Sequence, residues 1–478
     1  MSAYTPAPVW PTLDAPLSDR AEPARFPQVT QRFRNQPWAA RVGLGGLDDA
    51  DWARHFAAFA PLPDNLPEPL ALRYHGHQFR FYNPQLGDGR GFLFAQLRDP
   101  VDGRLLDLGT KGSGTTLWSR GGDGRLTLKG GFREALATEL LEALGVNTSK
   151  TFSLFETHES LIRYDEPSPT RSSVLVRLSH SHVRFGTFHR LAWEQDDRAL
   201  RALTDYVVAL YYPEIAQGPG ELPARLLTRV CERSAALAAQ WMVAGFVHGV
   251  LNTDNMNITG ESFDYGPYRF VPNGDPGFVA AYFDNTGLYA YGRQAGAVLW
   301  NLQRLAEALS RIAPKAALEA ALEGYGDAFL AALRRGLCER LGLTPLGGAR
   351  DRALVEAVSA FLLHRPVDFE RFFFDTWGGL ARRSFALQGP AARWYEGPLY
   401  DRLLAALEPY APARPERLDA SYFQGDAPLS LVYEEIEALW SPIDQHDDWS
   451  AFNHRIQEIR ALAALLGRGS QVHQTGAQ

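Results

Sequence analysis

A cluster of side chains that can bind metal or move protons lies between positions 248 and 264. His248 and Asn255 have the spacing of the kinase motif His-x-Asp-x-x-x-x-Asn, and Asp264 begins an Asp-Tyr-Gly. In kinases the motif's Asp accepts the substrate hydroxyl proton, while its Asn and the Asp of Asp-x-Gly bind metal. Here Val250 occupies the position of the usual base. Because valine cannot accept a proton, the proton-accepting role is either lost or taken by another residue, and Asp254 is the nearest candidate.

The same stretch offers hard oxygen ligands for a divalent cation. Asn255 and Asp264 are the predicted metal ligands, and ligands of this type suit Mg²⁺ or Mn²⁺ on the phosphates of a nucleotide. The alternative is structural, since Asn-Thr-Asp-Asn is also typical turn sequence at the end of a helix. His248 and the later Asp-Tyr-Gly favour the metal site.

Two copies of Gly-Asp-Gly-Arg precede predicted strands and suggest phosphate-binding loops. Glycine lets backbone amides approach an anion closely, and arginine adds a forked donor. Each loop taken alone is also typical of a hairpin turn. The occurrence of both loops in one region favours phosphate binding. The candidate residues are Gly87, Gly89, Arg90, Asp123 and Gly124.

Lys111 lies at the end of a predicted strand in a chain where only four of the 48 basic side chains are lysines. Glu134 lies on the helix predicted next. A strand lysine held by a helix glutamate directs an ammonium group at phosphates in kinase-like folds. Arg177 and Arg184 are seven positions apart, and two guanidinium groups can clamp an anion. The alternative for all four is an ordinary surface charge.

Short strands and one helix must position these residues. The strands are predicted from β-rich runs bounded by Gly, Asp or Pro, at 91–98, 104–110, 125–130, 151–156 and 172–179. Apolar residues at helical spacing predict a helix over 132–144, which Gly145 ends.

The rest of the chain reads as mostly helical. Helices are predicted at 224–246, 292–311, 315–341, 350–364, 395–408, 428–440 and 448–466. We therefore expect an α+β protein with a small mixed β lobe and a large helical lobe. The expected parts are an irregular Pro-rich arm (1–65), the small lobe (66–212), the helical lobe with the catalytic and metal motifs (213–466) and a flexible tail (467–478).

Composition narrows the function classes. The chain has 478 residues, 45% hydrophobic and 22% charged, and a formal net charge of −7. The acidic balance argues against nucleic acid as a partner, and no apolar run approaches the roughly 18 residues that span a membrane. Cys231 and Cys338 cannot form a disulfide framework and are expected to be buried. We expect a cytoplasmic protein.

With these motifs in order, the chain resembles the selenoprotein O family, the YdiU-like pseudokinases that transfer AMP to proteins. The resemblance rests on "HGHQF", "LGDGR", "KGSGTT", "GDGR", "RLSHSHVRFG" and "VHGVLNTDNMNI" followed by "FDYGPYRF", between about Tyr74 and Phe270. It implies a kinase-like bilobal fold that binds ATP in reversed orientation and presents the α-phosphate to a Ser, Thr or Tyr hydroxyl of a protein substrate.

The resemblance also assigns roles to individual residues. Asp254 is the expected proton acceptor, Asn255 and Asp264 the metal ligands and Glu134 the partner of Lys111. The remaining positions are expected to bind the nucleotide: Gly87, Gly89, Arg90, Lys111, Asp123, Gly124, Arg177 and Arg184.

Some positions depart from the family pattern. Thr115 to Trp118 replace a Pro-rich run, and Gly130 and Gly131 stand where serines are usual. The C-terminus has neither Cys nor selenocysteine, so redox gating through such a residue is not expected. Two other hypotheses stay open: a phosphotransferase that uses Asp254 as base, and a catalytically silent nucleotide-binding scaffold.

Overall fold

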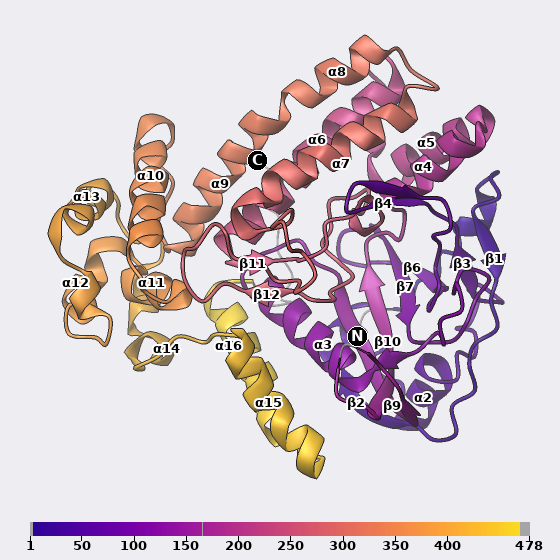
Figure 1. Cartoon of the computed structure of the whole chain (residues 1–478), viewed down its shortest axis with the longest axis horizontal. Coiled ribbons are helices and arrows are strands. Elements are labelled where there is room, and N and C mark those ends of the chain that lie inside the picture. The colour runs from indigo at the N-terminus through magenta and orange to yellow at the C-terminus, as the bar shows by residue number, and fades with distance from the viewer. Residues whose placement is uncertain (1–2, 165, 469–478) are drawn as a thin grey trace.

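A computed structural model describes residues 3–164 and 166–468 and shows an α+β fold (Figure 1). A sheet-rich N-terminal part is followed by a helical C-terminal part, as the sequence predicts. Most of the predicted tail, residues 469–478, lies outside the described residues. The kinase-like bilobal arrangement remains a prediction.

The main sheet has eight strands, and each of its strand pairs is antiparallel. Short β8 (Leu126–Thr127) pairs with β10 beside the main path. The order along that path is β1 (Ser18–Arg20), β3 (Leu70–Leu72), β6 (Leu93–Arg98), β7 (Leu105–Lys111), β10 (Thr170–Ser179), β9 (Lys150–Leu161) and β2 (Thr30–Arg34).

Side-chain alternation gives the sheet two different faces. On β10, Val174 and Val176 belong to a core with α1 (Gln36–Arg41) and α2 (Asp49–Phe56), whereas Leu175 packs in the core of α3 (Leu128–Ala143). Successive strand residues point to opposite faces, so Arg177 shares the α3 face with Leu175. Leu175 pairs in register with Lys111 of β7. The antiparallel register therefore places Lys111 and Arg177 together under α3.

The N-terminal 65 residues are more regular than the predicted Pro-rich arm. They contain β1, β2, α1 and α2, and the two strands form opposite edges of the main sheet. Trp52 of α2 is fully buried and stacks on Phe152 of β9. The sequence did not predict this packing, because proline interrupts the apolar residues. The regular elements are also short and depend on the sheet that they join.

Helices also appear where none was predicted. Helices α4 (Phe185–Glu194) and α5 (Asp197–Tyr211) follow β10, so the region before residue 212 has more than the single predicted helix. The predicted strand at 125–130 is also corrected. Only Leu126 and Thr127 are strand, because the Thr127 side chain caps α3 by accepting a hydrogen bond from the Gly130 N–H.

The C-terminal part contains a helix in each predicted range, but the helix predicted at 428–440 lies at Tyr433–His446. Short helices at 383–386 and 421–424 were not predicted. The predicted helix 315–341 is two helices that meet at Gly324. The set is α6 (Leu222–Val243), α7 (Gln294–Leu309), α8 (Lys315–Glu323), α9 (Tyr325–Arg340), α10 (Gly348–His364), α11 (Phe369–Thr376), α12 (Arg383–Ala386), α13 (Gly397–Leu407), α14 (Ser421–Gln424), α15 (Tyr433–His446) and α16 (Ser450–Leu465). Helix α16 returns to lie beside α3 (Figure 1).

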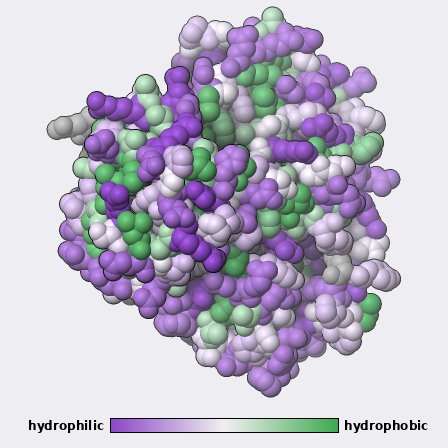
Figure 2. Space-filling view, turned by 60° about the vertical axis from the view of Figure 1, so that its left-hand side comes forward, coloured by the Kyte–Doolittle hydropathy of each residue, from purple (hydrophilic) through white to green (hydrophobic). Residues whose placement is uncertain are grey.

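Surface and cysteine features agree with the composition. Hydrophilic residues cover most of the face shown in Figure 2, and hydrophobic residues there form small groups. Cys231 and Cys338 are both buried and free, and burial raises the pKa of each thiol to about 12. Among the described residues, no helix is long and apolar enough to cross a membrane.

Candidate active site

Lys111, Glu134 and Arg177 form a buried ionic group between the sheet and α3. The Lys111 Nζ atom lies 2.6 Å from Glu134 Oε2, and Arg177 Nη2 lies 2.8 Å from Glu134 Oε1. Burial works against ionisation of Glu134, but the charges of Lys111 and Arg177 outweigh it and lower the pKa of this carboxyl. The glutamate therefore stays ionised and fixes both cations.

Asp264 joins this group from the helical part of the chain. Its Oδ1 atom lies 2.9 Å from Lys111 Nζ and 3.2 Å from Arg177 Nη2, and its Oδ2 atom lies 3.6 Å from Arg184 Nη1. Desolvation opposes ionisation, yet these cations hold the pKa of Asp264 well below its usual range. Asp264 has a left-handed backbone, φ 63°, which Asp adopts more readily than most residues.

Arg184 connects the ionic group to the loop that contains Asp254. Its guanidinium lies between the rings of Tyr74 and Phe263, 4.5 and 4.7 Å from the ring centroids, and it donates a 2.7 Å hydrogen bond to the Asp254 carbonyl. Asp88 Oδ1 lies 3.6 Å from Arg184 Nη2. The sequence motifs did not indicate a site role for Tyr74, Phe263 or Asp88. The ring contacts were out of their reach, while Asp88 was visible inside the first Gly-Asp-Gly-Arg.

Asp254 is a buried carboxyl beside this group. Burial raises the pKa of Asp254 to about 6, although the nearby Arg184 charge partly offsets the effect. Its Oδ1 atom is buried and accepts no hydrogen bond from any described residue. A Cβ atom added to Gly76 would lie 2.5 Å from this oxygen. The Asp254 carboxyl is thus confined, is more basic than the carboxyl of an ordinary Asp, and has an oxygen free to accept a proton.

Four polar side chains hold the loop around Asp254. The Asn252 Oδ1 atom accepts hydrogen bonds from the Phe79 N–H and the Tyr289 hydroxyl, at 3.0 and 2.9 Å. Thr253 Oγ1 accepts the His77 N–H at 2.7 Å. Both backbone donors come from the hairpin of β4 (Gly76–Gln78) and β5 (Phe81–Asn83): His77 lies on β4 and Phe79 in the turn.

His248 and Asn255 also hold this loop. His248 connects it to the Asp-Tyr-Gly segment, and Asn255 forms a hydrogen bond within the loop. The His248 ring lies with Nε2 3.0 Å from the Phe263 carbonyl, and burial lowers the pKa of His248, so a neutral Nε2–H donor fits this contact. Asn255 donates through Nδ2 to the Val250 carbonyl at 2.9 Å. Because the amide nitrogen is used, the amide oxygen is the atom that can act as a ligand.

The first Gly-Asp-Gly-Arg loop packs tightly on Trp118. A Cβ atom added to Gly87 would lie 2.4 Å from the Trp118 ring, and one added to Gly89 would lie 2.8 Å from the Trp118 carbonyl. Close packing therefore explains both glycines. Among the described residues, the N–H groups of Gly89 and Arg90 have no acceptor, so they remain candidates for binding an anion.

A family model matches residues 3–460 of this chain, and its description is Protein adenylyltransferase SelO. The chain belongs to the SelO family. It is also 42% identical over 464 residues to a protein nucleotidyltransferase YdiU of Synechocystis, covering 93% of this chain and 95% of that protein. A protein nucleotidyltransferase YdiU of Gloeobacter violaceus is 45% identical over 472 residues, covering 96% and 95% of the two chains. Family membership confirms the resemblance and makes the chain an enzyme of the nucleotidyltransferase class.

The second Gly-Asp-Gly-Arg loop of this SelO-family chain stays apart from the ionic group. Asp123 pairs with Arg163 at 2.8 Å and accepts the Arg125 N–H at 3.0 Å. Gly124 has φ +68°, and a Cβ there would lie 2.2 Å from the Gly114 carbonyl carbon. The structure gives neither residue a contact with Lys111 or Asp264, and their nucleotide-binding role stays a prediction.

Asp264 and Asn255 are donors of the type that suits a divalent ion sharing its ligands with phosphates. Mg²⁺ commonly takes one or two carboxylates and completes its shell with substrate phosphates and water. Asp264 supplies an ionised carboxylate and Asn255 an amide oxygen. Within residues 3–164 and 166–468, no group of three or more His, Cys, Asp or Glu forms a self-sufficient metal site. The nucleotide would therefore have to complete the coordination.

Proposed function

We propose that the chain is a metal-dependent protein adenylyltransferase that transfers AMP from ATP to Ser, Thr or Tyr hydroxyls. The observation that carries the proposal is the pairing of a cationic group with a separate basic carboxyl. Lys111, Arg177 and Arg184 converge on Asp264, and Asp254 lies beside them with a raised pKa and an unused oxygen. The kinase-like interpretation of the fold, with ATP reversed, belongs to the same proposal.

The chemistry is a displacement at the α-phosphorus. The substrate hydroxyl oxygen forms a bond to that phosphorus, and the bond to the oxygen that bridges the α- and β-phosphates breaks. Pyrophosphate leaves with the electron pair, and the hydroxyl proton goes to Asp254. Lys111, Arg177 and Arg184 bind phosphate oxygens, while Glu134 holds the first two cations in place.

Asn255 and Asp264 would hold Mg²⁺ or Mn²⁺ against the phosphates. A bound ion supplies charge neutralisation at the phosphate oxygens and a fixed orientation for the leaving group. Asp264 suits the role because neighbouring cations keep it ionised.

The deciding experiment uses ATP labelled separately at the α and γ positions with a mixture of acceptor proteins. We expect label to enter protein from the α position, with one pyrophosphate released per transfer. Entry from the γ position alone would show a conventional phosphotransferase and overturn the proposal.

Replacement of Asp254 separates an enzyme from a silent scaffold. Asp254→Asn keeps the size of the side chain but removes the proton acceptor. General base catalysis typically contributes about 10²–10⁴-fold, so we expect turnover to fall by that order while ATP binding is retained. A variant with the parent's turnover would exclude Asp254 as the base.

Chelation tests the metal assignment. Excess EDTA should abolish transfer, and added Mg²⁺ or Mn²⁺ should restore it in the parent. Asp264→Asn should need a higher metal concentration for half-maximal activity. Full activity in excess EDTA would contradict the assignment of Asn255 and Asp264 as metal ligands.

A further inference from the structure

A second cleft, of about 710 Å³, lies apart from the candidate active site. Its walls come from the loop 144–150 after α3, from α6 and α9, from the short helix η7 (Pro415–Asp419) and from residues 466–468. Lys111, Glu134, Asp254 and Asp264 are not among its lining residues. The volume is within the range of small-molecule sites.

The cleft is basic although the whole chain is acidic. Seven cationic side chains line it against the three carboxyl groups of Glu142, Glu261 and Glu339. The chain as a whole has a formal net charge of −7. The cations come from five separate parts of the chain: Arg104, Lys150, Arg335, Arg340, Arg414, Arg417 and Arg468.

Three of these cations have no carboxylate partner among the described residues. No carboxylate of the described residues lies within ion-pair distance of Arg335, Arg414 or Arg417, although the structure pairs many of the chain's other arginines. Arg340 pairs with Glu370, yet its buried Nε atom has no acceptor among the described residues. The cleft therefore presents guanidinium donors that an anion can use.

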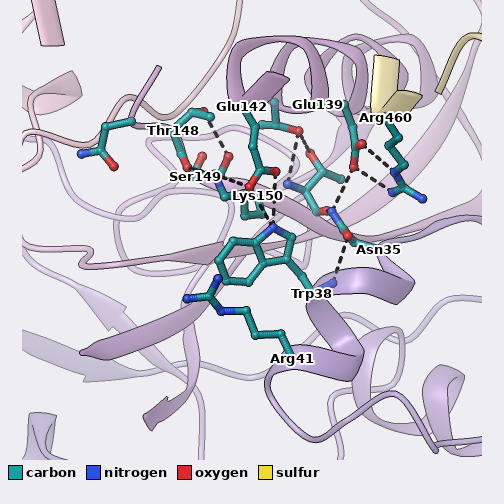
Figure 3. Close-up of polar contacts among 12 residues, drawn as sticks. Asn35, Trp38, Arg41, Glu139, Glu142, Thr148, Ser149, Lys150 and Arg460 are labelled. Atoms are coloured by element: carbon teal, nitrogen blue, oxygen red, sulfur yellow. Dashed lines mark hydrogen bonds and ion pairs between the residues drawn. The ribbon is translucent and has the colours of Figure 1, made fainter. Parts of the chain in front are cut away.

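The wall that contains Lys150 and Glu142 is held by internal contacts. Lys150 Nζ lies 3.2 Å from Glu142 and donates to the Thr148 carbonyl at 2.7 Å, and the Trp38 indole N–H donates to Glu142 at 3.1 Å. Figure 3 shows these side chains gathered at the end of α3, beside the Asn35, Glu139 and Arg460 contacts. This wall is preorganised, which lowers the entropy cost of binding a ligand.

The same wall is hydrogen-bonded to the segment that ends at Asp264. Asn147 Nδ2 donates to the Gly260 carbonyl at 2.8 Å, and the Ser149 N–H donates to the Ser262 carbonyl at 2.9 Å. The Ser262 N–H donates back to the Asn147 carbonyl at 2.8 Å. A shift of the loop 144–150 would therefore move the backbone two residues from the candidate metal ligand.

We propose that this basic cleft binds a small, multiply phosphorylated molecule at a second site and that its occupancy changes the rate of the enzyme. Forked guanidinium groups bind phosphate oxygens in pairs, and three uncompensated arginines favour a ligand with several phosphate charges. The concave shape and the limited volume select a small molecule. The binding part of the proposal is independent of AMP transfer; the rate effect depends on the proposed function.

Calorimetric titration of the full chain with inorganic tripolyphosphate tests the binding. The triple variant Arg335→Gln, Arg414→Gln and Arg417→Gln should bind the probe about tenfold more weakly or worse, because hydrogen bonds to charged groups are strong. The matched control changes three exposed arginines outside the cleft that form no ion pair with the described residues: Arg201→Gln, Arg352→Gln and Arg393→Gln. The control has the same change in net charge and should bind like the parent.

Equal probe affinity in both triple variants, or a single site from which ATP displaces the probe, overturns the second site. Weak binding confined to the cleft variant supports it. Thermal unfolding checks the fold, and the double variant Arg335→Gln and Arg414→Gln, at two exposed positions, replaces the triple variant if that unfolds.

The rate effect is measured separately as AMP transfer at saturating ATP with and without the probe. We expect a change of about fivefold or more in the parent and the control, a typical size for coupling between sites, and none in the cleft variant. Binding without a change of rate would leave the site standing and overturn its regulatory role. Absence of AMP transfer in every sample would instead count against the proposed function.

Discussion

At the scale of single residues, the candidate site is a balance of charges around Asp264. Three cations, Lys111, Arg177 and Arg184, surround two ionised carboxylates, Glu134 and Asp264. A third carboxyl group, that of Asp88, lies 3.6 Å from Arg184. Asp264 serves as counterion in the free protein, so its proposed metal role requires phosphates to take over part of the cation contacts.

Lys111→Arg tests whether the compact ammonium matters. The Lys111 Nζ atom lies between Glu134 and Asp264 in a side chain that is 6% exposed, and a guanidinium is wider and planar. The exchange keeps the charge but should displace the phosphates, and a shift near 1 Å costs about a hundredfold in rate. We expect that loss in steady-state AMP transfer, with circular dichroism unchanged.

Lys315→Arg is the control for this exchange, since its side chain is 82% exposed. It should behave like the parent. If Lys111→Arg also keeps the parent's turnover, Lys111 does not contact the nucleotide and the assignment of the cationic group is wrong.

At the scale of elements, the sequence predicts what depends on local periodicity. Lys111 at a strand end and Glu134 on the next helix were both predictable, because alternation and helical spacing fix each residue within its own element. The convergence of Arg177 with Glu134 needed the register of β10 against β7. Gly76 and Phe263 reach the site through contacts between distant segments, which no single-sequence pattern encodes.

Gly76→Ala tests how the β4–β5 hairpin confines the Asp254 carboxyl, the proposed proton acceptor. A Cβ atom at position 76 would lie 2.5 Å from Asp254 Oδ1, so Asp254 must move. We expect turnover to fall by about a hundredfold through misplacement of the base. The KM for ATP should change little, because the cations proposed to bind phosphate lie on other elements.

Gly46→Ala provides the comparison, because a Cβ atom there meets nothing within 4 Å. It should retain the parent's kinetics. Normal turnover in Gly76→Ala would show that the position of Asp254 does not limit the reaction.

At the scale of the whole molecule, composition and periodicity predicted the α+β class but not how the ends of the chain close the fold. Residues 18–34 supply both edge strands of the sheet, and α15 and α16 return from the C-terminal part to pack near α3. A charged contact joins the two ends. Arg32 of β2 and Arg171 of β10 both bind Glu156 of β9 and also Asp447, which follows α15.

Asp447→Asn measures the stability that this contact supplies as a function of pH. Partial burial works against ionisation of Asp447, but hydrogen bonds from Arg171 and Arg32 outweigh it and hold its pKa at about 2. A carboxyl whose pKa is lower in the folded state than in the unfolded state stabilises the fold above the unfolded pKa, about 3.9, and loses that effect as the pH falls. Asn also tolerates the left-handed backbone at position 447, φ 53°.

We therefore expect urea unfolding at pH 7 to show the variant less stable than the parent by on the order of 0.5–1 kcal/mol, as for an exposed ion pair. The difference should stay constant down to about pH 5 and shrink between about pH 4 and pH 2, where the parent's carboxyl gains a proton. Asp444→Asn on α15 is the control, because Asp444 is exposed and forms no ion pair with the described residues. A difference that stays undiminished at pH 3 would show that the arginines do not stabilise the Asp447 carboxylate.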